Sequence, residues 1–141
     1  MTNASKYALA GLLLVLASGA AFADDLTGAN RILCSAAQAT VCGDDGECET
    51  AVPWTWNIPQ FMELDFPGKM LATTKASGEN RQTPMGTVKR EGGWIFIQGV
   101  EAGRAFSFAI EEQTGLMSVA VARRGLTVSV FGACTPVPAS R

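Results

Sequence analysis

The sequence of 141 residues contains no histidine. This absence excludes His-based catalytic triads, histidine metal sites and histidine pH switches together. The only tyrosine, Tyr7, lies in an N-terminal segment that we expect to be removed, so a tyrosine general acid is excluded as well. Basic residues are not in excess, since 11 Lys and Arg face 13 Asp and Glu, and nucleic acid is therefore not an expected partner.

Long apolar runs are also missing, and the most apolar stretch lies close to the N-terminus. Residues 1–23 combine one lysine, an apolar core over 8–17 and a final Ala21-Phe22-Ala23, the pattern of a cleavable signal peptide. The apolar core is too short for a membrane anchor, which needs about 20 residues. We therefore expect cleavage after Ala23, no membrane anchor afterwards, and a periplasmic or secreted single β domain over residues 24–141.

All four cysteines lie after the predicted cleavage site, where an oxidising compartment favours two disulfides. Cys42 and Cys48 flank a five-residue loop with two glycines, which is typical of a hairpin turn, and this pairing leaves Cys34 for Cys134. A zinc site built from the four thiolates is the alternative. It is disfavoured because the spacing lacks two close cysteine pairs.

Beyond residue 24 the chain reads as successive short strands separated by glycine-bearing turns. In 104–110, Phe106 and Phe108 alternate with small residues, and Val119 does the same in 116–122, so each strand has one large apolar face. We expect strands over 31–41, 48–52, 60–66, 69–75, 83–90, 94–100, 104–110, 116–122 and 126–131. This pattern predicts an all-β antiparallel up-and-down meander that closes into a small barrel; the alternative is a β-sandwich.

The number of strands is limited by the disulfides. With nine strands the first and last run parallel, which would place Cys34 far from Cys134. With eight strands they run antiparallel and the two cysteines meet. We therefore favour eight, with residues 48–66 forming one strand that is broken at its proline-rich aromatic stretch.

Four short segments are distinctive in sequence. They are Asp-Leu-Thr-Gly-Ala-Asn at 25–30, Pro-Trp-Thr-Trp-Asn-Ile-Pro-Gln-Phe at 53–61, Gly-Val-Glu-Ala-Gly-Arg at 99–104 and Val-Phe-Gly-Ala-Cys at 130–134. In their order and wording they resemble uncharacterised small exported all-β proteins of Gram-negative bacteria. The resemblance covers nearly all of residues 24–141. It implies a periplasmic address and no particular activity.

Motifs of known chemistry are weak in this sequence. Glu63 and Asp65 share one side of a predicted strand, like a glycosidase pair, but their alternation with Met62 and Leu64 favours the wet face of an amphipathic strand. The acidic turn around 44–49 lacks the spacing of a calcium loop, and no serine lies in a nucleophile motif. We therefore assign no catalytic residue, no metal ligand and no cofactor.

Two features stand out as candidate binding sites. Trp54 and Trp56 lie between two prolines, which predicts a loop or edge where the rings plug one end of the barrel or form a platform for a sugar or an apolar ligand. In a meander, the 75–83 loop and the turns at 101–104 and 123–125 share one rim, which we call the basic rim. It gathers Lys75, Arg81, Arg104, Arg123 and Arg124 against Glu79 and Glu101. The alternative is that these are scattered charges that keep the turns soluble.

These observations favour a non-catalytic binding or protein-interaction module. The expected partner is an anionic small molecule, a glycan or an acidic envelope protein. An inhibitor or accessory subunit of an envelope protein is the first alternative, which an exposed apolar or aromatic patch at one rim would favour. An enzyme with an unrecognised carboxylate or Ser/Lys site is the second.

Overall fold

The computed structural model describes residues 24–78 and 80–138, so the predicted signal peptide and Glu79 lie outside the described residues. The described chain is almost entirely β-structure, with two short 3₁₀ helices. Its strands are β1 Arg31–Gly43, β2 Cys48–Ala51, β3 Phe61–Asp65, β4 Met70–Thr73, β5 Gln82–Pro84, β6 Thr87–Glu91, β7 Trp94–Glu101, β8 Arg104–Glu111, β9 Leu116–Arg123 and β10 Leu126–Pro136. The helices are η1 Pro53–Trp56 and η2 Lys75–Ser77.

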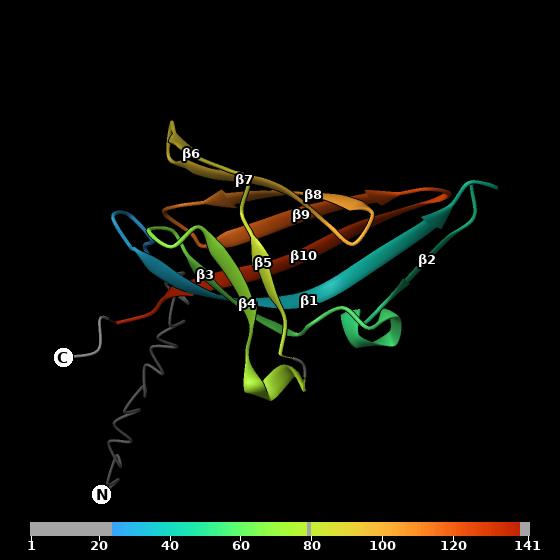
Figure 1. The fold of residues 1–141 in the computed structure, drawn as a ribbon, viewed down its shortest axis with the longest axis horizontal. Helices are drawn as coiled ribbons and strands as arrows, with labels where there is room; N and C mark the ends of the chain where they lie inside the picture. The colour runs from blue at the N-terminus through green and yellow to red at the C-terminus, as the bar shows by residue number, and fades with distance from the viewer. Residues whose placement is uncertain (1–23, 79, 139–141) are drawn as a thin grey trace, which may run out of the picture.

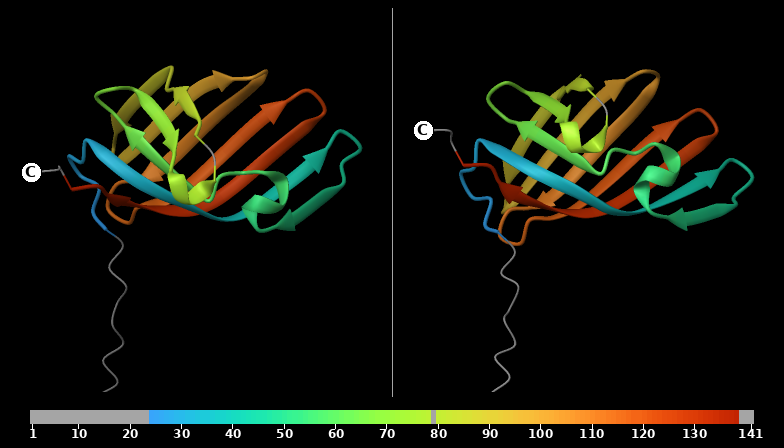
Figure 2. Two further views of the ribbon diagram at one scale, coloured as in Figure 1. Left: turned by 60° about the horizontal axis from the view of Figure 1, so that its bottom comes forward. Right: turned by 90° about the horizontal axis from the view of Figure 1, so that it is seen from below.

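The strands form one antiparallel sheet in the order β5-β4-β3-β1-β10-β9-β8-β7-β6, with β2 paired to β1 beside this path. Figures 1 and 2 show that the sheet curls into a half-barrel. The predicted all-β antiparallel class and the meander are therefore confirmed, and a single sheet replaces the alternative sandwich.

The predicted broken strand over 48–66 is confirmed by the pairing of β1. One edge of β1 pairs with β10, and the other edge pairs first with β3 and then with β2. Helix η1 stands between these two pieces, where Pro53 and Pro59 interrupt the ladder. The chain leaves the sheet edge for this helix and returns to the same edge.

The prediction of eight strands closing into a barrel is wrong in its detail, because the expected strand over 83–90 is two strands. Its first part, β5, pairs with β4, whereas its second part, β6, pairs with β7. Within the described residues β5 and β6 are the two ends of the sheet path, so ladder pairing leaves a seam there. Pro84 lacks an amide N–H and ends β5 after three residues, which explains the break.

Both predicted disulfides are formed. Cys34 and Cys134 are direct partners on β1 and β10, and Cys42 bonds Cys48 across the β1–β2 hairpin. Beside the first bridge, the β1–β10 register shifts after Ala36, and Gly132 lies against β1. A Cβ on Gly132 would come 2.0 Å from the carbonyl oxygen of Ser35, so only glycine fits this contact.

The core fills the concave side of the sheet. The predicted faces of β8 and β9 are confirmed, since Phe108, Ile110, Met117 and Val119 are buried and Ser107 is exposed. The other fully or nearly fully buried apolar side chains come from the whole path: Leu26, Ile32, Cys34, Ala36, Ala39, Met62, Leu64, Leu71, Met85, Ile95, Ile97, Val130 and Cys134.

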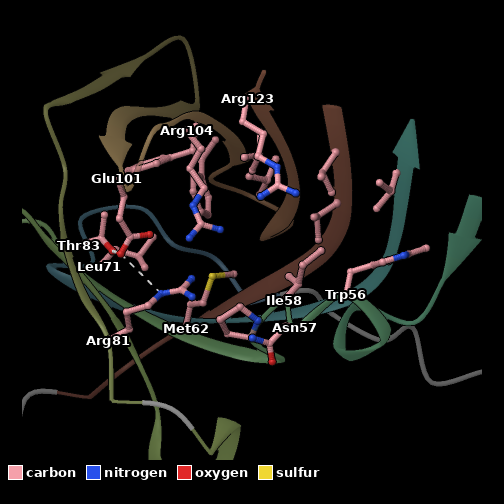
Figure 3. Close-up of a pocket in the computed structure, with 18 of the residues that line it drawn as sticks. Trp56, Asn57, Ile58, Met62, Leu71, Arg81, Thr83, Glu101, Arg104 and Arg123 are labelled. Carbon is pink, nitrogen blue, oxygen red and sulfur yellow. Dashed lines mark hydrogen bonds and ion pairs between the residues drawn. The ribbon is translucent and has the colours of Figure 1, made fainter. Parts of the chain in front are cut away.

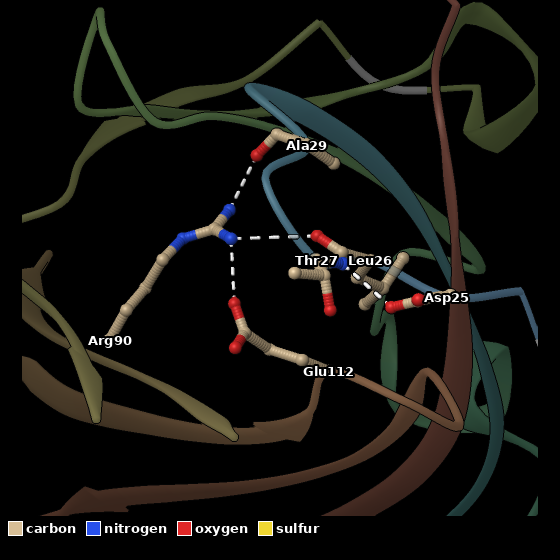
Figure 4. A network of polar contacts seen from close by, with 6 residues as sticks. All are labelled: Asp25, Leu26, Thr27, Ala29, Arg90 and Glu112. Carbon is tan, nitrogen blue, oxygen red and sulfur yellow. Dashed lines mark hydrogen bonds and ion pairs between the residues drawn. The ribbon is translucent and has the colours of Figure 1, made fainter. Parts of the chain in front are cut away.

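One end of the half-barrel is closed by the segment that precedes β1. Leu26 is fully buried there, and its amide N–H donates to the carbonyl of Glu112 at 2.7 Å. Arg90 of β6 donates to the carboxylate of Glu112 at 2.6 Å and to the carbonyl of Ala29 at 2.5 Å, contacts that Figure 4 draws as dashed lines. The same guanidinium lies 4.7 Å from the ring of Phe66. Arg90 thus ties β6 to the β8–β9 turn and the first described residues.

Candidate functional site

The other end of the half-barrel contains a cavity of about 280 Å³, and we call it the pocket. The turns at 101–104 and 123–126 lie at this end because Glu101 pairs with Arg104 and Arg123 pairs with Leu126. The pocket is lined by Val41, Trp56, Asn57, Ile58, Pro59, Met62, Leu71, Arg81, Thr83, Glu101, Arg104, Phe106, Phe108, Val119, Val121, Arg123, Leu126, Val128 and Val130. Three of the four arginines proposed from the sequence, and Trp56, therefore surround one cavity.

Strand alternation explains which arginines enter the pocket. Phe106 and Phe108 face inward on β8, and Arg104 continues the same side of that strand at the rim. On β9, Val121 faces inward and Arg123 continues its side in the same way. Arg124 has the opposite parity and does not line the pocket, which separates it from the other candidates.

The guanidinium groups of Arg81, Arg104 and Arg123 all point into the pocket (Figure 3). Within the part of the chain that the structure describes, the guanidinium groups of Arg104 and Arg123 make no hydrogen bond and no ion pair. The Nε atom of Arg81 lies 3.6 Å from Oε1 of Glu101. Two guanidinium groups thus approach one space without an ion-pair partner among the described residues, although like charges repel one another.

The acidic member of the mouth is held by a buried hydroxyl. Thr83 is 2% exposed, and its Oγ1 donates to Oε1 of Glu101 at 2.5 Å. This contact links β5 to the end of β7. The pairing of β6 with β7 stops at Gln98, so at the pocket end the last residues of β7 take the place of β6 across the seam from β5. Glu101 therefore holds Arg81 and closes the seam, while its single negative charge leaves the mouth positive.

The two tryptophans of η1 have different positions. Trp56 packs against the hydrophobic core and lines the pocket, followed by Asn57 in the left-handed conformation and by Ile58. Trp54 is 56% exposed and is not a lining residue. The predicted edge placement is thus confirmed, and only Trp56 contributes to the pocket.

Two candidate sites that the sequence analysis treated as weak have ordinary local contacts. Met62 and Leu64 face the core while Glu63 pairs with Arg31 on the neighbouring strand, as expected for an amphipathic strand. In the acidic turn, Oδ1 of Asp45 accepts from the amide of Glu47 at 3.0 Å. Over the described ranges, 24–78 and 80–138, no group of three or more potential ligands could hold a metal ion.

The remaining cation of the basic rim, Lys75, is exposed at the start of η2 and does not line the pocket. The described residues that line the cavity therefore supply apolar side chains, the indole of Trp56, three guanidinium groups, one carboxylate, one amide and one hydroxyl. The roles of Thr83 and Glu101 in joining the seam were not predicted from the sequence. Alternation would have indicated Thr83, because it lies on β5 two residues after Arg81, which also lines the pocket.

Comparisons with known proteins add no family, since no family model matches the chain and no curated protein or solved structure matches it significantly. No helix among the described residues is long and apolar enough to cross a membrane.

Proposed function

We propose that the protein is an exported, non-catalytic binding module that takes a small anionic ligand into its pocket. The observation that carries this proposal is the pair of guanidinium groups, Arg104 and Arg123, that face an apolar cavity and have no partner among the described residues. An anionic group between them offsets their repulsion and gains charge-assisted hydrogen bonds. Among the described lining residues the one carboxylate, Glu101, already accepts from Thr83, which supports recognition rather than catalysis.

Export is part of the same proposal. The predicted signal peptide supports it, and two disulfides are compatible with an oxidising compartment. We expect the protein isolated from the periplasm or medium of a Gram-negative host to begin at Asp24 and to contain no free thiol. N-terminal sequencing and thiol titration test this, and a product that begins at Met1 would contradict it.

Native mass spectrometry of the exported protein tests ligand binding directly. We expect an added mass that disappears on denaturation and is reduced in the Arg104→Gln, Arg123→Gln double variant. Arg124→Gln is the matched control, because it removes a neighbouring charge that lies outside the pocket. Absence of the added mass, together with no stabilisation by any anion, would contradict the proposal.

A second candidate function is that of an inhibitor or accessory subunit of an envelope protein. Large side chains are exposed on the convex face, with Trp94 and Phe96 stacked at 6.3 Å on β7 and Phe131 53% exposed on β10. Phe96 and Phe131 belong to one cross-strand row with the uncharged Ala109 and Ser118 between them, so an uncharged apolar protein surface fits this face.

Binding between purified components tests this second candidate. A partner captured from envelope extract would be identified by mass and then added back to the purified protein. Phe96→Ser should abolish the reconstituted complex, and Arg123→Gln should leave it unchanged. The reverse result would assign the partner to the pocket.

A further inference from the structure

We propose that the occupant of the pocket is an amphipathic monocarboxylate of about eight to ten carbons, with its carboxylate at the rim and its apolar body inside. This inference rests on the proposed function and specifies the class of ligand. It is carried by the order of side chains along the pocket, by the charges at its mouth and by its size.

The side chains below the rim form an apolar sleeve. Two successive cross-strand rows face inward, the first with Phe106, Val121 and Val128 and the second with Phe108, Val119 and Val130. Met62 and Leu71 add apolar surface from β3 and β4. The interior of the pocket therefore favours an apolar body and leaves no row of polar groups for a hydroxyl-rich one.

Among the described lining residues the hydroxyl belongs to Thr83, and it already donates to Glu101. A sugar that entered the apolar sleeve would lose water from its hydroxyls and find polar partners only at the rim. The apolar sleeve therefore disfavours the glycan that the sequence left open, and an anion with an apolar body is the best chemical match.

The rim determines the kind of head group. Arg104 and Arg123 supply two forks of N–H donors from adjacent strands, which suits the two oxygens of a carboxylate. Glu101 keeps a negative charge at the same mouth, next to Arg81. That charge repels a dianionic phosphate more than a monoanion.

The volume limits the length of the ligand. A water molecule occupies about 30 Å³ of liquid, so the cavity of about 280 Å³ holds roughly nine non-hydrogen atoms of similar size. A carboxylate of eight carbons has about that size, and a chain two carbons longer fills the mouth as well. Longer chains should gain no further buried contact while the carboxylate stays at the rim.

Calorimetric titration of the disulfide-bonded protein with saturated fatty acids tests the apolar body. Affinity should rise about fourfold with each added methylene and level off at eight to ten carbons. Octanol should bind at least tenfold more weakly than octanoate, because it lacks the charge that Arg104 and Arg123 recognise. Octanedioate should not bind measurably, because its second carboxylate would enter the apolar sleeve.

Variants test the orientation. Arg104→Gln or Arg123→Gln should each weaken octanoate binding about tenfold or more, whereas Arg124→Gln should leave it unchanged. A Cβ on Gly99 would lie 2.3 Å from Cζ of Phe106, so Gly99→Ala must displace that ring at the pocket wall. Gly99→Ala and the pocket-filling Val119→Phe should move the best chain length to shorter acids. Circular dichroism confirms that each variant is folded.

The outcomes separate this inference from the proposed function. Arginine-dependent binding of citrate or octyl phosphate, with no effect of chain length, would leave an anion-binding module and overturn the amphipathic monocarboxylate. Equal binding of octanol and octanoate would overturn recognition of the head group. Failure of every anion to bind would overturn both proposals.

Discussion

Replacement of Phe108 by alanine probes the packing that supports both the fold and the floor of the pocket. Phe108 is 4% exposed, and its cross-strand partners are Ile97 on β7 and Val119 on β9. Removal of a buried ring from such a site costs about 3–5 kcal/mol of unfolding free energy. We expect a loss in this range for Phe108→Ala.

Phe106 is the matched position two residues earlier on the same strand. Its ring meets that of Phe108 edge to face at 5.9 Å, but it is only half-buried. We therefore expect Phe106→Ala to lower the free energy of unfolding by about 1–2 kcal/mol, because the Phe106 side chain buries less apolar surface than that of Phe108. The double variant should show a coupling of about 0.5–1.5 kcal/mol from the paired rings.

Urea denaturation of the oxidised protein, followed by tryptophan fluorescence and circular dichroism, measures these differences. Similar m-values are needed for the comparison. A loss below about 1 kcal/mol for Phe108→Ala, or a larger loss for Phe106→Ala, would refute the inward register of β8.

Three further predictions concern the two disulfides, the contacts of Arg90 at the closed end of the half-barrel, and the pKa of Asp25. On the chain-entropy model, loss of the Cys34–Cys134 bridge, with a sequence separation of 100, should lower the free energy of unfolding by about 4–5 kcal/mol. Loss of the Cys42–Cys48 bridge, with a separation of 6, should lower it by about 2 kcal/mol. Denaturation of the paired alanine variants measures both losses. Arg90→Leu should cost about 2 kcal/mol and speed hydrogen exchange of the Leu26 amide, because two carbonyls and Glu112 lose their donor; an unchanged exchange rate would contradict the tie. Hydrogen bonds from the Thr27 side chain and backbone lower the pKa of Asp25. Its contribution to stability is therefore present above the normal carboxyl pKa and is lost as pH falls through the pKa of the folded state. The melting temperature of Asp25→Ala, followed across acid pH, should lack this loss.

Alternation of side chains accounts for what the sequence predicted well. The β8 and β9 segments have large apolar residues at every second position, and their inward faces follow directly from this pattern. The prolines around Trp54 and Trp56 likewise predicted the interruption between β2 and β3. In β7, however, Trp94 and Phe96 are apolar on the side opposite Ile95, so alternation could not tell which face was buried.

The break between β5 and β6 depends on contacts that no local pattern records. Pro84 signalled the end of a ladder, but it did not indicate that the chain would change neighbours there. The change depends on long-range packing: Met85 is 2% exposed in the core, and a Cβ on Gly86 would meet the carbonyl of Gln98 at 3.2 Å. The closure by Leu26 is of the same kind, since one leucine before the first strand has no periodicity.

Glu101 connects the seam to the mouth of the pocket, and its two roles can be separated by substitution. Glu101→Gln keeps an acceptor for Thr83 but removes the negative charge, so we expect stability to change by less than about 1 kcal/mol. Octanoate affinity should rise up to about fivefold, because the positive mouth loses its internal competitor.

Glu101→Ala removes the acceptor as well as the charge. The buried hydroxyl of Thr83, a residue that is 2% exposed, then loses its acceptor on Glu101. We expect the free energy of unfolding, measured by urea denaturation, to fall by about 1–3 kcal/mol. Weaker octanoate binding in Glu101→Gln would instead mean that the carboxylate orients Arg81 for the ligand. Equal stability of the two variants would mean that the Thr83 contact does not hold the seam.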